Sequence, residues 1–189
     1  MSSEQKVVFE TERLLVRAAT QDDAALFYAL WTDPRVMTNV GFPQGLPVTQ
    51  DELKKTLSRQ GNSEFDRLLV VQLKATGQAI GECKLSRPNS NGIAEPDVKL
   101  LPGFWGHKYG IEVWSALIDY QFTHTDCSVV QATPNVVNKA SIKMQEAVGA
   151  VRTGEDTHRF PDSMQDYTTP IHHYIYRVNR ADWKQNRAA

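Results

Sequence analysis

Cysteine is scarce in this sequence, with only Cys83 and Cys127 among 189 residues. The two cysteines lie far apart, and no CxxC or Cys/His spacing is present, so neither a disulfide framework nor a zinc site is indicated. We expect no bound metal. This cysteine usage is typical of a reducing compartment, and we therefore expect a cytoplasmic protein.

Long apolar runs and an excess of one charge sign are also missing. No stretch approaches the roughly 18 apolar residues of a membrane span, and the first residues do not form a signal peptide. The 21 lysines and arginines balance 22 aspartates and glutamates to a formal net charge of −1. Without a basic cluster, the chain has no electrostatic footprint for nucleic acid or for an anionic membrane surface. We expect neither as a partner.

What the sequence does contain is the composition of one globular domain. Hydrophobic residues make up 41% of the chain and charged residues 23%, values typical of a protein with a packed core. No internal repeat or low-complexity linker divides the sequence. Residues 1–189 are therefore predicted to form a single domain.

Apolar periodicity and capping signals predict interspersed strands and helices. Thr49 with Glu52 forms a capping box, and Gly149 is placed to end a later helix. Residues 154–170 are expected to form a long loop. Strands are expected over 12–17, 67–73, 79–85, 95–101, 128–133, around 151 and over 174–178, and helices over 20–31, 50–58, 109–122 and 138–148. The order β-αα-βββ-α-β-α-ββ implies an α+β (mixed α/β) fold, in which helices flank a single twisted mixed sheet.

The segment 105–112 leads from an expected strand into a helix and carries Gly106 and Gly110. Such a turn presents unpaired backbone N–H groups and the positive end of a helix dipole, which suit a pyrophosphate. His107 and Lys108 would add positive charge there. The two commoner phosphate loops, GxxxxGK[ST] and GxGxxG, are absent. Taken alone, the segment is a weak signal, and an ordinary glycine-containing strand-to-helix turn is the simpler interpretation.

A set of short phrases runs along the chain in a fixed order. These are Thr11-Glu12-Arg13-Leu14-Leu15-Val16-Arg17, Asp22-Asp23, Asp33-Pro34, Ala94-Glu95, Pro102, Trp105-Gly106, Tyr109-Gly110, Glu112, Asn138 with Ser141, and Gly149. In this order they resemble the GCN5-related N-acetyltransferases (GNAT), and within them the ribosomal-protein N-terminal acetyltransferase-like branch. The resemblance covers about residues 11–154.

The resemblance implies a GNAT fold, acetyl-CoA as co-substrate, and direct attack of an amine on the bound thioester without an acyl-enzyme. A backbone N–H of the strand near Leu100 or Leu101 would polarise the thioester carbonyl. The residues that the resemblance assigns to the acyl-CoA site are Leu100, Leu101, Gly106, His107, Lys108, Tyr109, Gly110, Asn138 and Ser141.

The sequence departs from the family pattern at two places. Lys108 stands where the family usually has the first glycine of its phosphate loop, and a non-glycine residue is restricted if that position needs a positive φ. A lysine there could instead pair with the pyrophosphate. Pro96-Asp97 replaces the usual apolar residue and glycine, which alters how an acceptor is presented beside Glu95.

Three residues are candidates for the chemistry of acyl transfer. On a regular strand Glu95 and Asp97 would share one face, where either could act as base or bind a cationic acceptor; both could also be solvated strand carboxylates. Ser141 could donate a proton to the departing thiolate, or could simply bond to the backbone in a first helical turn. Glu112 is predicted to stabilise a helix start rather than to act in catalysis.

These observations predict an acyl-CoA-dependent N-acyltransferase that transfers acetyl to a primary amine. The acceptor is expected to be a small-molecule or peptide amine, and the protein a monomer or homodimer. Two other classes stay open at this point. One is a catalytically silent acyl-CoA-binding sensor, which the two departures would suit, and the other is an interaction module that keeps the fold without the ligand.

Overall fold

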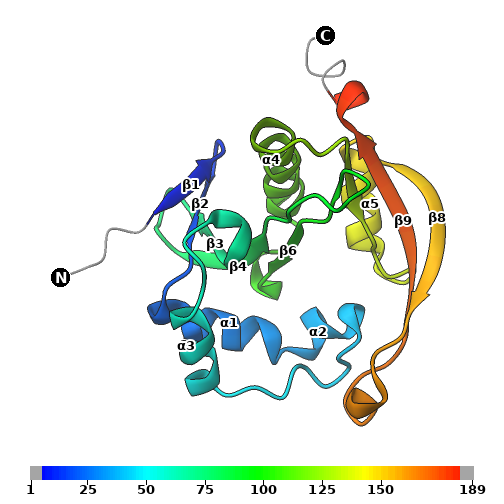
Figure 1. The fold of residues 1–189 in the computed structure, drawn as a ribbon. Helices are drawn as coiled ribbons and strands as arrows, with labels where there is room; N and C mark the ends of the chain where they lie inside the picture. Colours follow the sequence, from blue (N-terminus) through cyan, green and yellow to red (C-terminus); the bar gives the residue numbers. More distant parts are fainter. Residues whose placement is uncertain (1–5, 184–189) are drawn as a thin grey trace.

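The structure is a computed structural model that describes residues 6–183 (Figure 1). Its strands are β1 (Val7–Glu10), β2 (Leu14–Ala18), β3 (Leu69–Leu73), β4 (Ala79–Lys84), β5 (Ile93–Ala94), β6 (Asp97–Leu100), β7 (Val129–Ala132), β8 (Val151–His158) and β9 (Ile171–Asn179). Its α-helices are α1 (Ala24–Trp31), α2 (Pro34–Met37), α3 (Gln50–Ser58), α4 (Tyr109–His124) and α5 (Lys139–Ala147). No helix in this part of the chain is long and apolar enough to span a membrane.

The strands form two sheets that meet at one stretch of chain. The first sheet has the order β1-β2-β3-β4-β6, and all of its neighbouring strands are antiparallel. The second has the order β5-β7-β9-β8, in which only the β5–β7 pair is parallel. β5 leads into β6 through Glu95 and Pro96, so consecutive residues belong to different sheets. Proline has no N–H to donate, which favours an interruption of the ladder at this point.

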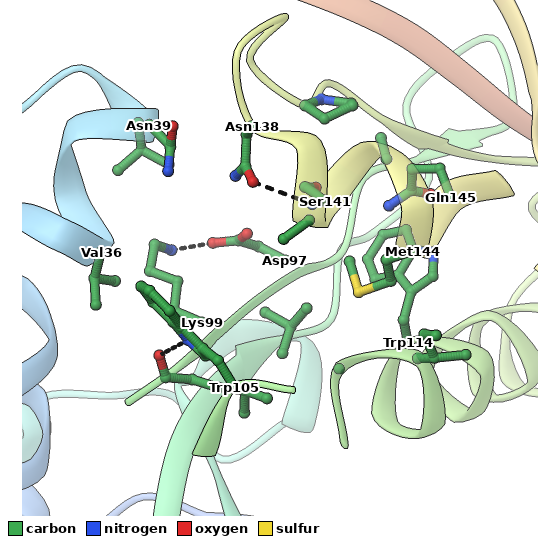
Figure 2. A pocket seen from close by; sticks show the side chains of 18 of the residues that line it. Val36, Asn39, Asp97, Lys99, Trp105, Trp114, Asn138, Ser141, Met144 and Gln145 are labelled. Atoms are coloured by element: carbon green, nitrogen blue, oxygen red, sulfur yellow. Dashed lines mark hydrogen bonds and ion pairs between the residues drawn. The ribbon is translucent and has the colours of Figure 1, made fainter. Parts of the chain in front are cut away.

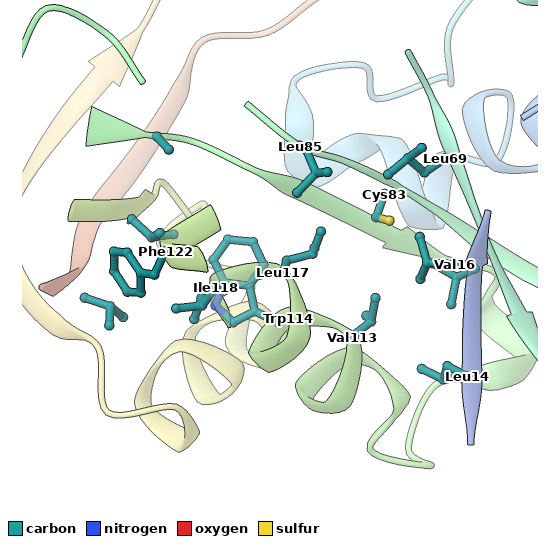
Figure 3. Close-up of a cluster of buried hydrophobic side chains, with 14 of the residues drawn as sticks. Leu14, Val16, Leu69, Cys83, Leu85, Val113, Trp114, Leu117, Ile118 and Phe122 are labelled. Atoms are coloured by element: carbon teal, nitrogen blue, oxygen red, sulfur yellow. The ribbon is translucent and has the colours of Figure 1, made fainter. Parts of the chain in front are cut away.

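Helix α4 covers one face of the five-stranded sheet (Figure 3). The opposite face is covered by α1 and α3, because Val70 of β3 packs with Phe27 of α1 and Leu53 of α3. Alternate residues of β3 thus face different helices, as the two-residue repeat of a strand requires. The core beneath α4 includes Leu14, Val16, Leu69, Val71, Cys83, Val113, Trp114, Leu117, Ile118 and Phe122.

Side-chain caps fix where the helices begin. The predicted capping box at α3 is confirmed: Glu52 N–H donates to Thr49 Oγ1, and Thr49 N–H donates to Glu52 Oε2. Asn138 caps α5 by accepting from the N–H of Ser141 at 3.1 Å. Gly149, just after this helix, has a φ of +78°, as expected for a helix-ending glycine.

The predicted fold class is confirmed, but the sheet and three strands differ from the expectation. The single sheet is split in two, and the strand expected over 95–101 is divided into β5 and β6. β1 was not predicted. β8 extends to His158, well into the expected loop, and pairs with β9 over its length. Its polar, mostly exposed residues lack the apolar alternation by which a strand is recognised.

Candidate functional site

A cleft of about 680 Å³ lies between the two sheets, where β6 of the first sheet and β7 of the second diverge. Residues from α2, β6, the start of α4, the end of β7 and α5 line it (Figure 2). Glu95, Asp97, Leu100, Gly106, Lys108, Tyr109, Gly110, Asn138 and Ser141 are among its lining residues. Leu101 and His107, which the sequence also assigned to this site, are not. Leu101 packs instead against the small apolar cluster around Leu30.

The backbone of β6 distinguishes Leu100 from Leu101. The N–H of Leu101 donates to Ile80 O at 2.9 Å and is therefore engaged with β4. N–H groups of successive residues point to opposite sides of a strand, so that of Leu100 points away from β4. The carbonyl of Leu100 points the same way and accepts from the indole N–H of Trp105 at 2.8 Å. Since β6 is the edge of its sheet, the Leu100 amide is directed to the gap where the cleft lies.

The turn before α4 is built from left-handed residues. Gly106 has a φ of +83°, and a Cβ atom added there would meet no heavy atom within 4 Å. Lys108, the N-cap of α4, has a φ of +65° and is the only non-glycine residue with a positive φ in the described part of the chain. The family position that Lys108 occupies thus does require a left-handed backbone. The first N–H groups of α4 have no partner within the helix and face this turn.

Gly110 and His107 also make contacts within the fold. A Cβ atom at Gly110 would lie 3.4 Å from Met144 Sδ, so this glycine allows α4 to approach α5. His107 lies beside Tyr109, with ring centroids 5.6 Å apart, and its carbonyl accepts from Arg13. The Arg13 guanidinium also lies 4.5 Å above the Tyr109 ring.

Glu112 binds the β1–β2 turn to α4. Its carboxylate accepts from Thr11 Oγ1 at 2.6 Å and from the backbone N–H of Arg13 at 2.9 Å, and it pairs with the Arg13 guanidinium. Burial raises the pKa of Glu112, but these bonds outweigh burial and leave it below its usual value. The carboxylate is thus committed to a structural contact, as the sequence predicted.

Glu95 and Asp97 do not lie on one regular strand. Glu95 precedes β6 and accepts from Gln131 Nε2 at 2.5 Å, while Gln131 Oε1 accepts from Arg177. Asp97 begins β6 and pairs with Lys99. Both carboxylates line the cleft, but Glu95 is bound by Gln131 of β7 and Asp97 by Lys99 of β6.

Lys99 and Glu82 extend the site beyond the residues found from the sequence. They lie directly opposite each other on β6 and β4, with Lys99 Nζ 3.4 Å from Glu82 Oε1. Glu82 Oε1 also accepts from the indole N–H of Trp31 at 2.6 Å. The alternation of Asp97 and Lys99 was a readable sign that they share a face. The pairing with Glu82 depends on strand register, which no local pattern reveals.

Burial and charge determine the pKa values in this cluster. Burial lowers the pKa of Lys99, but the two carboxylates beside it outweigh burial and raise it above its usual value. For Asp97, desolvation raises the pKa, but the Lys99 ammonium and hydrogen bonds outweigh this effect. The pKa of the Asp97 carboxyl is therefore below its usual value. Burial raises the pKa of Glu82. Residues 6–183 contain no group of three or more His, Cys, Asp or Glu arranged to hold a metal ion.

Comparison of the sequence with known proteins identifies a family. The sequence model of the acetyltransferase (GNAT) domain matches residues 13–151. The uncharacterized N-acetyltransferase p20 of Bacillus licheniformis is 28% identical over 149 residues, which are 76% of this chain and 82% of the relative.

Solved acetyltransferases have the same fold. The spermidine N-acetyltransferase of Vibrio cholerae, solved with CoA and spermine, has a TM-score of 0.73 at 19% identity and covers 91% of this chain and 98% of its own. The ribosomal-protein-S5-alanine acetyltransferase of Vibrio fischeri has a TM-score of 0.73 at 19% identity, with coverages of 93% and 97%. Since the family model spans most of the chain, the protein belongs to the GNAT acetyltransferases.

Proposed function

We propose that this protein transfers an acetyl group from acetyl-CoA to a primary amine by direct attack within a ternary complex. The observation that carries the proposal is the opening between β6 and β7, with the Leu100 amide directed into it and the start of α4 at its side. The silent acyl-CoA-binding sensor is not favoured, because the cleft also holds carboxylates suited to an acceptor amine.

The residues present fit acetyl-CoA at the α4 end of the cleft. The turn at Gly106 has open space beside it, and the α4 N–H groups and Lys108 offer hydrogen bonds and charge to a pyrophosphate. The indole N–H of Trp114, a lining residue on α4, is buried and has no hydrogen-bond partner among residues 6–183. A buried donor of this kind gains free energy when a ligand oxygen pairs with it.

Four groups in the cleft can each contribute to one step of acetyl transfer. Acetyl-CoA supplies the activated acyl group. The Leu100 amide can donate to the thioester oxygen, where negative charge develops during attack. Glu95 is our candidate base for the acceptor amine. Asp97 can accept hydrogen bonds from the N–H groups of that amine. Ser141, on the first turn of α5, is our candidate donor of a hydrogen bond to the departing thiolate.

The acceptor class rests on analogy. Peptide amino termini would agree with the ribosomal-protein N-terminal acetyltransferase-like branch, and small amines would agree with the spermidine N-acetyltransferase similarity. A cytoplasmic location, a monomeric or homodimeric state, and the absence of nucleic-acid and membrane partners stay predictions from the sequence.

The proposal is tested by binding and turnover. Isothermal titration calorimetry with acetyl-CoA should give a Kd, and thiol release should be detected with a panel that includes spermidine and a peptide with a free amino terminus. Binding with turnover of at least one amine supports the proposal. Binding without turnover of any amine would support the sensor, and no binding would exclude both.

A further inference from the structure

A line of charged side chains leads from the core of the five-stranded sheet into the cleft. The exposed fraction of the side chain is 4% for Glu82, 16% for Lys99 and 53% for Asp97. Glu82 and Lys99 are a cross-strand pair, and Asp97 lies two residues before Lys99 on the same face of β6. In Figure 2 the Lys99 ammonium lies beside the Asp97 carboxylate, in the part of the cavity between α2 and α5. The most exposed member of the line is thus Asp97, which lines the cleft.

The buried end of this line is firmly anchored. Trp31 of α1 donates its indole N–H to Glu82 at 2.6 Å, and the ammonium of Lys99 supplies the counter-charge. Burying a carboxylate is costly unless it is paired and hydrogen-bonded, and even a paired buried ion contributes little net stability compared with apolar packing. Stability alone therefore does not account for three charges on this face of the sheet.

Resting on the proposed function, we propose that Glu82 and Lys99 are positioning residues, which hold the Asp97 carboxylate in the direction in which it receives the acceptor amine. Lys99 fixes the direction of the Asp97 side chain through their ion pair. Glu82 and Trp31 keep the Lys99 stem in place. Asp97 then orients the amine by accepting a hydrogen bond from its N–H, while the proton that the amine loses goes to Glu95, the candidate base.

Two other charged residues that line the cleft, Arg35 and Glu95, have partners of their own. Arg35 of α2 pairs with Asp33 at 2.6 Å, and Glu95 is held by Gln131. Lys84, opposite Asp97 on β4, adds to the positive charge around it. The titratable residues that line the cleft are Arg35, Glu95, Asp97, Lys99, Lys108 and Tyr109.

The test measures KM for the amine, kcat and the Kd of acetyl-CoA in matched variants. The probe acceptors are spermidine and a short peptide with a free amino terminus, whichever the wild type acetylates. Asp97→Asn should raise KM for the amine about 10- to 100-fold, since a charge-assisted hydrogen bond is lost, and leave the Kd of acetyl-CoA unchanged. Lys99→Met should raise KM by a similar factor and leave the Kd of acetyl-CoA unchanged, because Asp97 loses the ammonium that fixes its direction.

Two further variants separate positioning from a structural role. Lys99→Arg should have a KM for the amine close to that of the wild type. The double variant Lys99→Met/Asp97→Asn should have a KM no higher than that of Asp97→Asn alone. If Lys99→Met leaves Glu82 too poorly paired for folding, Lys99→Met/Glu82→Gln removes both buried charges and should show the same increase in KM. Lys74→Met, which removes an exposed lysine paired with Glu10 outside the cleft, is the matched control and should leave KM unchanged.

The outcomes distinguish this inference from the proposed function. If the wild type neither binds acetyl-CoA nor acetylates an amine, both proposals are wrong. If the wild type turns over and Lys99→Met keeps its KM, or adds its full defect to that of Asp97→Asn, only the positioning inference is wrong.

Discussion

Lys108 is the residue whose backbone departs furthest from what its side chain prefers. A left-handed conformation costs a residue with a Cβ atom roughly 1 to 2 kcal/mol compared with glycine. Lys108 has a φ of +65° at the N-cap of α4. We therefore expect Lys108→Gly to raise the free energy of unfolding by about 1 kcal/mol, measured by urea denaturation. Lys108→Ala is the control, since it removes the charge and keeps the Cβ atom. An equal gain in Lys108→Ala would trace the effect to charge.

Glu95 is our candidate base, and its carboxylate is held by Gln131 at the break before β6. Glu95→Gln should lower kcat/KM about 10²- to 10⁴-fold and leave the Kd of acetyl-CoA nearly unchanged. Because the lost step is proton removal, the defect should narrow as pH rises toward the pKa of the acceptor amine. A defect that is constant with pH would indicate acceptor positioning, and full activity would exclude the role.

Most individual site residues could be found in the sequence, but not their partners. Four residues that line the cleft could be predicted because short sequence phrases place them at or near helix starts. These residues are Gly106, Lys108, Asn138 and Ser141. Lys99 was missed because its significance depends on Glu82, seventeen positions away and opposite it only in the register of β4 with β6. Pairing across strands is a property of the folded sheet, so a single sequence does not reveal it.

Among the elements, α4 is held at both ends by contacts between charged side chains and other segments of the chain. At its start, Glu112 holds the β1–β2 turn through Thr11 and Arg13. At its end, Arg180 donates to the carbonyls of Phe122, Thr125 and Cys127. These carbonyls lie in or just after the last turn, where helix carbonyls lack internal partners. The helix that lines the cleft is therefore held in a fixed position.

Removing the contact at the start of α4 should make stability less dependent on pH. The pKa of Glu112 is lowered in the fold, so its stabilisation is present above the unfolded value of 4.5 and is lost as pH falls below it. We expect Glu112→Gln to cost about 1 to 3 kcal/mol at pH 7 and progressively less below pH 4.5, measured by urea denaturation. Glu10→Gln, at an exposed pair with Lys74, is the control and should cost little at either pH. A loss that stays constant down to pH 3 would contradict this.

The contact at the other end of α4 needs the geometry of arginine. Arg180→Lys keeps the charge but cannot reach three carbonyls at once, because an ammonium lacks the planar fork of a guanidinium. We expect a loss of about 1 to 3 kcal/mol in the free energy of unfolding. Arg152→Lys is the matched control, at an exposed ion pair on β8, and should cost below about 1 kcal/mol. Equal losses in the two variants would show that Arg180 is not a specific cap.

At the scale of the whole molecule, the cleft exists because the two sheets diverge. A ligand seated there contacts the start of α4 and β6 on one side, and β7 and α5 on the other. Acetyl-CoA at 100 times its Kd should stabilise the fold by about 2.7 kcal/mol, which is roughly 5 to 11 °C in Tm for a domain of this size. Differential scanning fluorimetry measures this shift, with CoA alone and ATP as controls. An identical shift with ATP would indicate unspecific anion binding.

The predicted order of elements reached the fold class, but not the division into two sheets. The division occurs at Glu95-Pro96, which the sequence marks only as an irregular point in a strand. Whether such a strand bulges, ends or changes sheets depends on β7, which pairs with β5 from more than thirty residues away along the chain. Long-range pairing decides this outcome, and local propensity does not.

One wall of the cleft depends on a part of the chain that does not line it. Asn39 and Val40 line the cleft beside α2, and the residues that follow pack against the β8–β9 connection: Thr169 N–H donates to Gly41 O, and Phe42 contacts the rings of Phe160 and Tyr167. A side chain at Gly41 would collide with Phe160, 2.4 Å away. Segments 38–46 and 159–170 are thus one unit for protein engineering. Changing acceptor preference by grafting loops from another acetyltransferase requires both segments from the same donor protein.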